Sequence, residues 1–216
     1  SGEGVPAHVG EARALIQHLL ARGDGTCNAC VVADGKAEGI DWSPQNACAQ
    51  GLCGSPFLKA LLAHVYGWSD ADFRAWFGAG TPSSTRWYDA IEAPDNEQIR
   101  KIEHIDNVRA GDIIAIKGKH SMLAAAQPAL EASPPAASLR DDTTQYTIDV
   151  IDAASSAHGS DDTRKATSGS GVGEGTARLY VNAVGKVVGY AWSTYSSSTV
   201  RMEQIAIGRL TDAVLE

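Results

Sequence analysis

Apolar side chains recur with helical spacing in the first half of the chain. Residues 8–21 and 55–66 each repeat them at intervals of three or four positions, which predicts amphipathic helices with one buried face. Ser69 is placed to cap a further helix that runs through residue 77, and residues 87–91 predict a short one. Between the first two helices, residues 24–51 are rich in Gly, Asp, Asn and Cys and lack a period, which indicates a long loop held by its thiols.

After Pro94 the pattern changes to β-branched and alternating positions. Apolar runs on either side of Gly118-Lys119 predict a hairpin. Further strands are expected over residues 145–152, 179–181, 187–192 and 204–210. Loops are expected over the Pro/Ala/Ser-rich insertion 127–142 and the Gly/Ser-rich segment 167–175. Helices first and strands afterwards predict one α+β domain over residues 1–216.

Composition narrows the classes of partner. The chain is 44% hydrophobic and 20% charged with a formal net charge of -8, and no cluster of Lys and Arg with interleaved aromatic residues offsets this acidity. Nucleic acid and anionic membranes are therefore disfavoured as partners. No apolar run approaches the length that spans a bilayer, so no membrane span is expected. The sequence starts at Ser1 without a methionine or a signal-like segment, so export cannot be read directly from it.

The four cysteines, at positions 27, 30, 48 and 53, all lie in one short region. The spacing Cys27-x-x-Cys30 is compatible with zinc, but the second pair is four residues apart and other convincing ligands are lacking. We expect no metal and no cofactor. A structural disulfide that joins Cys48 to Cys27 or to Cys30 is the favoured alternative, and the sequence does not choose between them. Such a bond implies an oxidising compartment, so a secreted or periplasmic location is expected.

Cys53 stands just before the apolar helix 55–66 and is the candidate nucleophile. Ser55 can cap the first free N–H groups of that helix, and Pro56 suits its first turn. The positive end of a helix lowers the pKa of a nearby thiol and so favours the reactive thiolate. The alternative is that Cys53 is a small buried residue or one half of a disulfide.

A cysteine nucleophile needs a base and a group that orients the base. His120 opens the second strand of the predicted hairpin and is the candidate base. On the next strand, alternation puts Asp152 on the same face as Ile148 and Val150, at the strand end, where it can orient His120. The following polar loop contains His158 and Arg164, which are expected to bind substrate, and His158 is also an alternative to Asp152 as the orienting group.

These features resemble the NlpC/P60 family of papain-like cysteine peptidases. The shared order is a helix-borne cysteine, then Arg109-Ala110-Gly111-Asp112 leading into an apolar strand, then a histidine and a polar residue on the next two strands. The family usually reads Asp-Cys-Ser-Gly-Phe, with the aromatic residue three positions after the cysteine, whereas Phe57 lies four positions after Cys53. Two alternatives follow: the helix begins one residue later, or Gly54 occupies the nucleophile position and the chain is inactive.

The resemblance implies an α+β papain-like domain in which N-terminal helices pack on an antiparallel sheet, with a C-terminal strand extension. It also implies a cysteine endopeptidase or amidase that acts on the stem peptide of bacterial peptidoglycan. Cys53 would attack the carbonyl and form a thioester, His120 would act as base and acid, and Asp152 would orient His120. Arg140 or Arg164 would meet the carboxylates of the peptide. The alternatives are a catalytically inactive domain that binds a peptide or protein partner, and a cysteine acyltransferase on the same fold.

Overall fold

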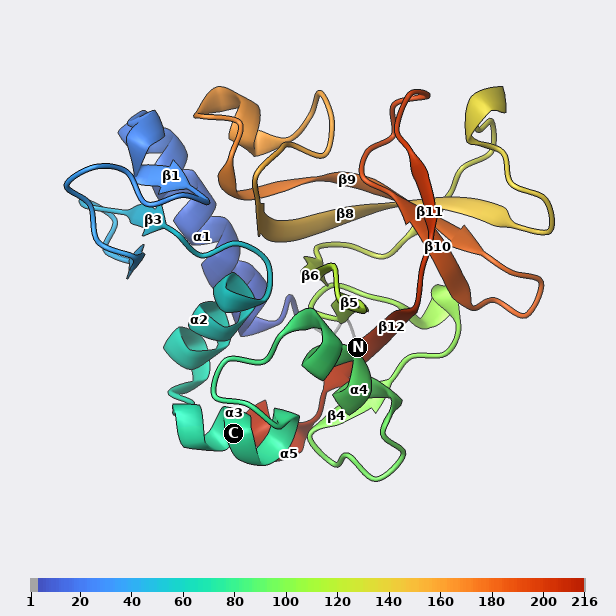
Figure 1. The fold of residues 1–216 in the computed structure, drawn as a ribbon, viewed down its shortest axis with the longest axis horizontal. Helices are drawn as coiled ribbons and strands as arrows, with labels where there is room; N and C mark the ends of the chain where they lie inside the picture. The colour runs from blue at the N-terminus through green and yellow to red at the C-terminus, as the bar shows by residue number, and fades with distance from the viewer. Residues whose placement is uncertain (1–3, 216) are drawn as a thin grey trace.

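The computed structural model describes residues 4–215 and confirms an α+β arrangement in which helices pack on a large antiparallel sheet (Figure 1). The helices are α1 (Ala7–Arg22), α2 (Ser55–Tyr66), α3 (Asp70–Phe77), α4 (Ser84–Glu92) and the short α5 (Asp212–Leu215). The strands of the large sheet are β4 (Ile99–Lys101), β5 (Ile113–Ile116), β6 (His120–Ala124), β7 (Ala129–Leu130), β8 (Thr144–Ala154), β9 (Gly171–Val181), β10 (Val187–Ala191), β11 (Val200–Met202) and β12 (Ile205–Leu210). Three short strands, β1 (Asn28–Ala29), β2 (Gly39–Asp41) and β3 (Cys48–Gln50), lie apart from it.

The large sheet runs in the order β11-β10-β9-β8-β6-β5-β12-β4, with β7 paired to the outer part of β8. Every pair in it is antiparallel. The hairpin expected around Gly118 is present as β5 and β6, and Gly118 has the positive φ of 68° that a tight turn demands. The hairpin therefore holds His120, the first residue of β6, at a fixed place beside the end of β8.

Both faces of the central strands are buried, and alternate residues serve two separate cores. On β5, for example, Ile113 and Ala115 pack with the helices, whereas Ile114 and Ile116 pack into a second cluster formed by the curved part of the sheet. The same alternation places Ile148 and Val150 of β8 in the second cluster. This explains why the strands read as continuous apolar runs.

Helix α2 has the predicted bounds, but its first turn differs from the prediction. Gly54 occupies the N-cap position with φ 64° and ψ −124°, and no side chain caps the helix. Ser55 is instead the first helical residue, and its hydroxyl bonds to that of Ser121 on β6 at 2.8 Å. This contact ties the start of α2 to the strand that carries His120. Ser69 does cap α3, through a reciprocal bond pattern with Asp72.

The segment 24–51, expected to be a loop, contains a small three-stranded sheet. β1 pairs with β3 in parallel and β2 pairs with β3 antiparallel. Trp42 in this segment stacks on His64 of α2 with 4.2 Å between ring centroids. The short strands lack an apolar period, which is why they could not be read from the sequence. They hold the cysteine-bearing segment firmly above the start of α2.

Candidate functional site

His120 and Asp152 form a hydrogen-bonded pair. The two residues come from the start of β6 and the C-terminal part of β8, and Nε2 of His120 lies 2.6 Å from Oδ2 of Asp152. The Asp152 side chain is fully buried, and that of His120 is 14% exposed. The buried carboxylate of Asp152 thus fixes the orientation of the His120 ring, while the exposed edge of the ring reaches a cavity. The structure brings these two predicted residues together in the predicted relation.

Asp152 is also held by His158 and Arg164. Nε2 of His158 lies 3.1 Å from Oδ2 of Asp152, and Nη1 of Arg164 lies 2.8 Å from Oδ1. Burial alone would raise the pKa of Asp152, but the charges of His158 and Arg164 and the hydrogen bonds from both histidines outweigh it. The pKa of Asp152 is held well below its usual value, so the carboxyl group is ionised and acts only as an acceptor.

His158 and Arg164 were expected to bind substrate, and this expectation is wrong. Both side chains are fully buried and line no part of the cavity described below. Nδ1 of His158 bonds to the backbone carbonyl of Trp192 at 2.6 Å, and Arg164 forms a second ion pair with Asp162 at 2.7 Å. They are positioning residues for Asp152. Asp162 was not anticipated, because only the fold brings it under the site strand.

The strand above this charge network is rich in glycine because side chains there would collide with the network. A Cβ on Gly173 would lie 2.6 Å from Cγ of Arg164, and one on Gly175 would lie 2.5 Å from Oδ2 of Asp162. This corrects the expected loop over 167–175, of which residues 171–175 belong to β9. Glycine in a strand often marks a close approach of this kind, and this was the available signal for the network.

The other side of the His120 ring faces Gly54. A Cβ on Gly54 would lie 3.1 Å from Nδ1 of His120. In the arrangement that a cysteine hydrolase needs, the side chain of the nucleophile extends toward the free nitrogen of the base. The residue that faces this nitrogen is Gly54, which has no side chain.

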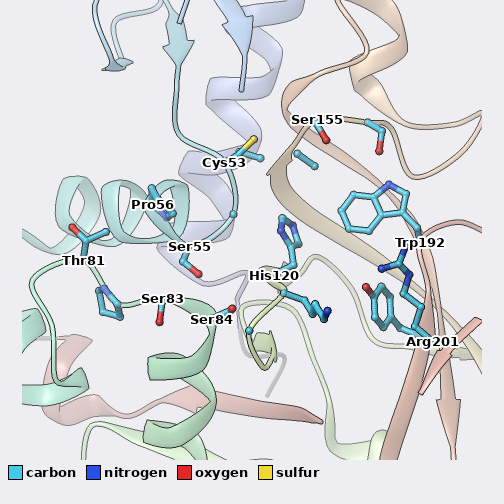
Figure 2. A pocket seen from close by; sticks show the side chains of 18 residues that line it. Cys53, Ser55, Pro56, Thr81, Ser83, Ser84, His120, Ser155, Trp192 and Arg201 are labelled. Carbon is cyan, nitrogen blue, oxygen red and sulfur yellow. The ribbon is translucent and has the colours of Figure 1, made fainter. Parts of the chain in front are cut away.

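Cys53 is the neighbouring residue, and its sulfur is joined to that of Cys30 in a disulfide. The free nucleophile and the alternative in which Cys48 pairs with Cys30 are therefore corrected, whereas the other expected partner of Cys48, Cys27, does lie beside it without a bond. Figure 2 shows the Cys53 sulfur, in the segment between β3 and α2, directed away from the His120 ring. In this state Cys53 has no thiol to deprotonate.

Cys27 and Cys48 form a second close pair, with their sulfur atoms 2.6 Å apart. Nζ of Lys36 lies 3.4 Å from the sulfur of Cys27. Burial and the neighbouring Cys27 raise the pKa of the Cys48 thiol to about 11. Cys48 is thus a poor nucleophile at neutral pH. Within residues 4–215 no group of three or more His, Cys, Asp or Glu side chains is arranged to hold a metal ion.

A cavity of about 730 Å³ opens above His120 (Figure 2). Its walls are the start of α2, the segment 81–84 before α4, the β5–β6 turn, the end of β8 and residues of β10 and β11. Trp192 lies on the side opposite Cys53, and its ring stacks on the buried ring of His158 at 4.0 Å. The volume lies within the range of small-ligand sites.

Comparison with known proteins adds one relative. The chain is 29% identical over 174 residues to the uncharacterized protein R653 of Acanthamoeba polyphaga mimivirus, an alignment that covers 72% of this chain and 76% of that protein. No family model matches the chain, and no solved structure matches it. None of the helices within residues 4–215 combines the length and the apolar character that crossing a membrane requires.

Proposed function

We propose that this chain is a ligand-binding domain on a papain-like framework of the NlpC/P60 type, with the base and its orienting acid in place and the nucleophile position left empty. The observation that carries the proposal is the position of Gly54 against Nδ1 of His120, combined with the disulfide that occupies Cys53. A hydrolase of this type needs a thiolate at that point.

The sequence pattern supports the same assignment. In the family the aromatic residue follows the nucleophile by three positions, and the residue three positions before Phe57 is Gly54. Cys53 then occupies the position of the family's aspartate. The backbone at Gly54 supports this further, because its φ of 64° and ψ of −124° are costly for any residue with a Cβ.

The proposed ligand is a peptide, with the stem peptide of bacterial peptidoglycan as the first candidate. The cavity above His120 is large enough for a short peptide and has hydroxyl groups and an aromatic wall. The disulfide between Cys30 and Cys53 favours a secreted or periplasmic setting, because such bonds persist in oxidising compartments.

The second candidate function is the cysteine amidase or endopeptidase itself, in a reduced form. One observation favours it: Cys53 lines the same cavity as His120. A reducing thiol, itself oxidised to a disulfide, would convert the Cys30–Cys53 bond to two thiols, and His120 would take the proton of Cys53. The thiolate would attack a peptide carbonyl and form a thioester as the C–N bond breaks, and His120 would pass the proton to the departing amine. Water would complete the hydrolysis, and an acyltransferase would pass the same acyl group to an amine.

The experiment incubates the protein with purified peptidoglycan stem peptides, with and without dithiothreitol, and follows binding by calorimetry and cleavage by mass spectrometry. The proposal expects binding without cleavage in both conditions, and retained binding in a Cys30→Ser/Cys53→Ser variant. Cleavage that needs dithiothreitol and is lost in Cys53→Ala would overturn it in favour of the amidase. An amide product formed with an added amine would identify the acyltransferase.

Alkylation with iodoacetamide across pH gives an independent test of the thiol. In the native protein Cys53 should remain unlabelled because its sulfur is bonded to Cys30. After reduction, comparison with His120→Ala shows whether His120 activates it. The proposal expects equal labelling rates in the two reduced proteins, whereas a rate that falls several-fold without His120 would establish an activated pair.

A further inference from the structure

The cavity above His120 differs in charge from the molecule as a whole. The chain has 26 acidic and 18 basic residues apart from histidine. Among the eighteen residues that line the cavity, Lys119, Arg201 and His120 carry basic groups and none is Asp or Glu. In an acidic protein, a cavity wall that carries basic groups and no carboxylate favours a negatively charged occupant.

The two cations are available to a ligand. Both side chains are exposed, and neither Lys119 nor Arg201 forms an ion pair with a carboxylate within residues 4–215. Lys119 belongs to the β5–β6 turn, directly before His120, and Arg201 lies on β11. Figure 2 shows Arg201 beside Trp192, on the side of the cavity opposite Cys53.

His120 offers a third contact through the nitrogen that the missing nucleophile leaves free. Its Nε2 bonds to Asp152, so a proton on that nitrogen is shared with the carboxylate, while Nδ1 faces the space above Gly54. When the ring carries a second proton, Nδ1 donates to an anion in that space.

We infer that the ligand carries a carboxylate group, which it presents to the basic groups of His120, Lys119 and Arg201 on the cavity wall. This rests on the proposed binding function and gives it a ligand class. His120 then acts as an anion receptor and no longer as a base. The ring of Trp192, backed by His158, gives the apolar part of the same ligand a flat wall.

Two matched probes test this assignment: N-acetyl-D-alanyl-D-alanine and its C-terminal amide, which differ only in the carboxylate. Calorimetry at pH 6 in low salt should show the acid binding at least about tenfold more tightly than the amide, as expected for a charge-assisted contact. The difference should shrink in about 0.5 M salt because partly exposed charges are screened.

Variants identify the groups that read the carboxylate. Arg201→Gln and Lys119→Gln should each weaken binding of the acid several-fold and leave the amide unchanged. Arg100→Gln removes the same charge from an exposed position outside the cavity and should change neither. Melting curves should be alike for all of them, because each replaced side chain is exposed.

The outcomes separate this inference from the proposed function. Equal affinity for the acid and the amide would overturn the carboxylate assignment while leaving a peptide-binding domain intact. An acid preference that survives undiminished in both Arg201→Gln and Lys119→Gln would also overturn it. If neither of the two probes binds and no stem peptide binds, both the inference and the proposed binding function fail.

Discussion

The two ring nitrogens of His120 face opposite kinds of surroundings. On the Nε2 side lies a complete, buried network in which Asp152 is held by His158 and Arg164, and Arg164 is held by Asp162. On the Nδ1 side lie a glycine and open space. The imidazole thus has a complete set of buried charged partners on one side and no neighbouring side chain at residue 54 on the other.

This difference separates orientation from reaction. Buried charges are retained only when each has a partner, so the network fixes the direction of the His120 ring whatever the ring is used for. A nucleophile, in contrast, is needed only for bond cleavage. An oriented imidazole with no nucleophile beside it is suited to hydrogen bonding with a ligand. The buried charge network around Asp152 can be tested without any substrate.

Removing the charge at the centre of the network should have the largest effect. Arg164→Met leaves the carboxylates of Asp152 and Asp162 buried without their cation, and we expect a loss of about 3–5 kcal/mol in the free energy of unfolding. Urea denaturation measures it. The exposed Arg140→Met is the control and should change stability by no more than about 0.5 kcal/mol. A loss below about 1 kcal/mol for Arg164→Met would contradict the network as described.

The disulfide between Cys30 and Cys53 should contribute somewhat less to the free energy of unfolding than Arg164 does. Cys30 and Cys53 are 23 residues apart, and closing a loop of that length contributes about 3 kcal/mol in the chain-entropy model. The wild type should lose about that much in urea denaturation when dithiothreitol is added, and Cys30→Ala/Cys53→Ala should show no such loss. The Cys27→Ala/Cys48→Ala variant should respond to the reductant as the wild type does. Stability that is independent of reductant in the wild type would argue against the bond.

The free energy of unfolding should depend on pH in the way expected for the ionisation of Asp152. Its pKa is depressed in the folded state, so its contribution is present above the unfolded value of about 3.9 and is lost as the pH falls through the folded pKa. The stability difference between wild type and Asp152→Asn should therefore narrow as the pH falls below about 4. The exposed Asp141→Asn should follow the wild type throughout. A difference that widens in acid would reverse the assigned sign.

Much of the scaffold could be predicted from the sequence. The apolar period gives α1, α2 and α3, and the β-branched runs give β5, β6, β8 and β12, because these elements bury regular faces. The same alternation on β8 put Asp152 at the end of an apolar face, and the structure places it against His120. Local periodicity is sufficient where burial is regular.

The parts that escaped prediction depend on contacts between distant segments. The pairing of Cys30 with Cys53 follows from how the segment 24–51 folds over α2, and the spacing of the cysteines does not encode it. The burial of His158 and Arg164 follows from the loop after β8 turning under its own strand. Polar residues in a loop usually indicate exposure, so these two were misread as ligand contacts.

The glycines of β9 allow the close packing over the charge network to be tested by its smallest change. In Gly173→Ala the added methyl group would meet the Arg164 side chain at 2.6 Å, inside a fully buried network that has little room to yield, so we expect a loss of about 1–3 kcal/mol. Gly10→Ala is the matched control: it lies within α1, its Cβ would meet nothing within 4 Å, and alanine should stabilise the helix by about 0.5–1 kcal/mol. Opposite signs for the same substitution, measured by urea denaturation, would show that β9 is glycine-rich because of what lies beneath it. If Gly173→Ala is neutral, the Arg164 side chain has room to shift, and the close approach of strand and network does not explain the glycine.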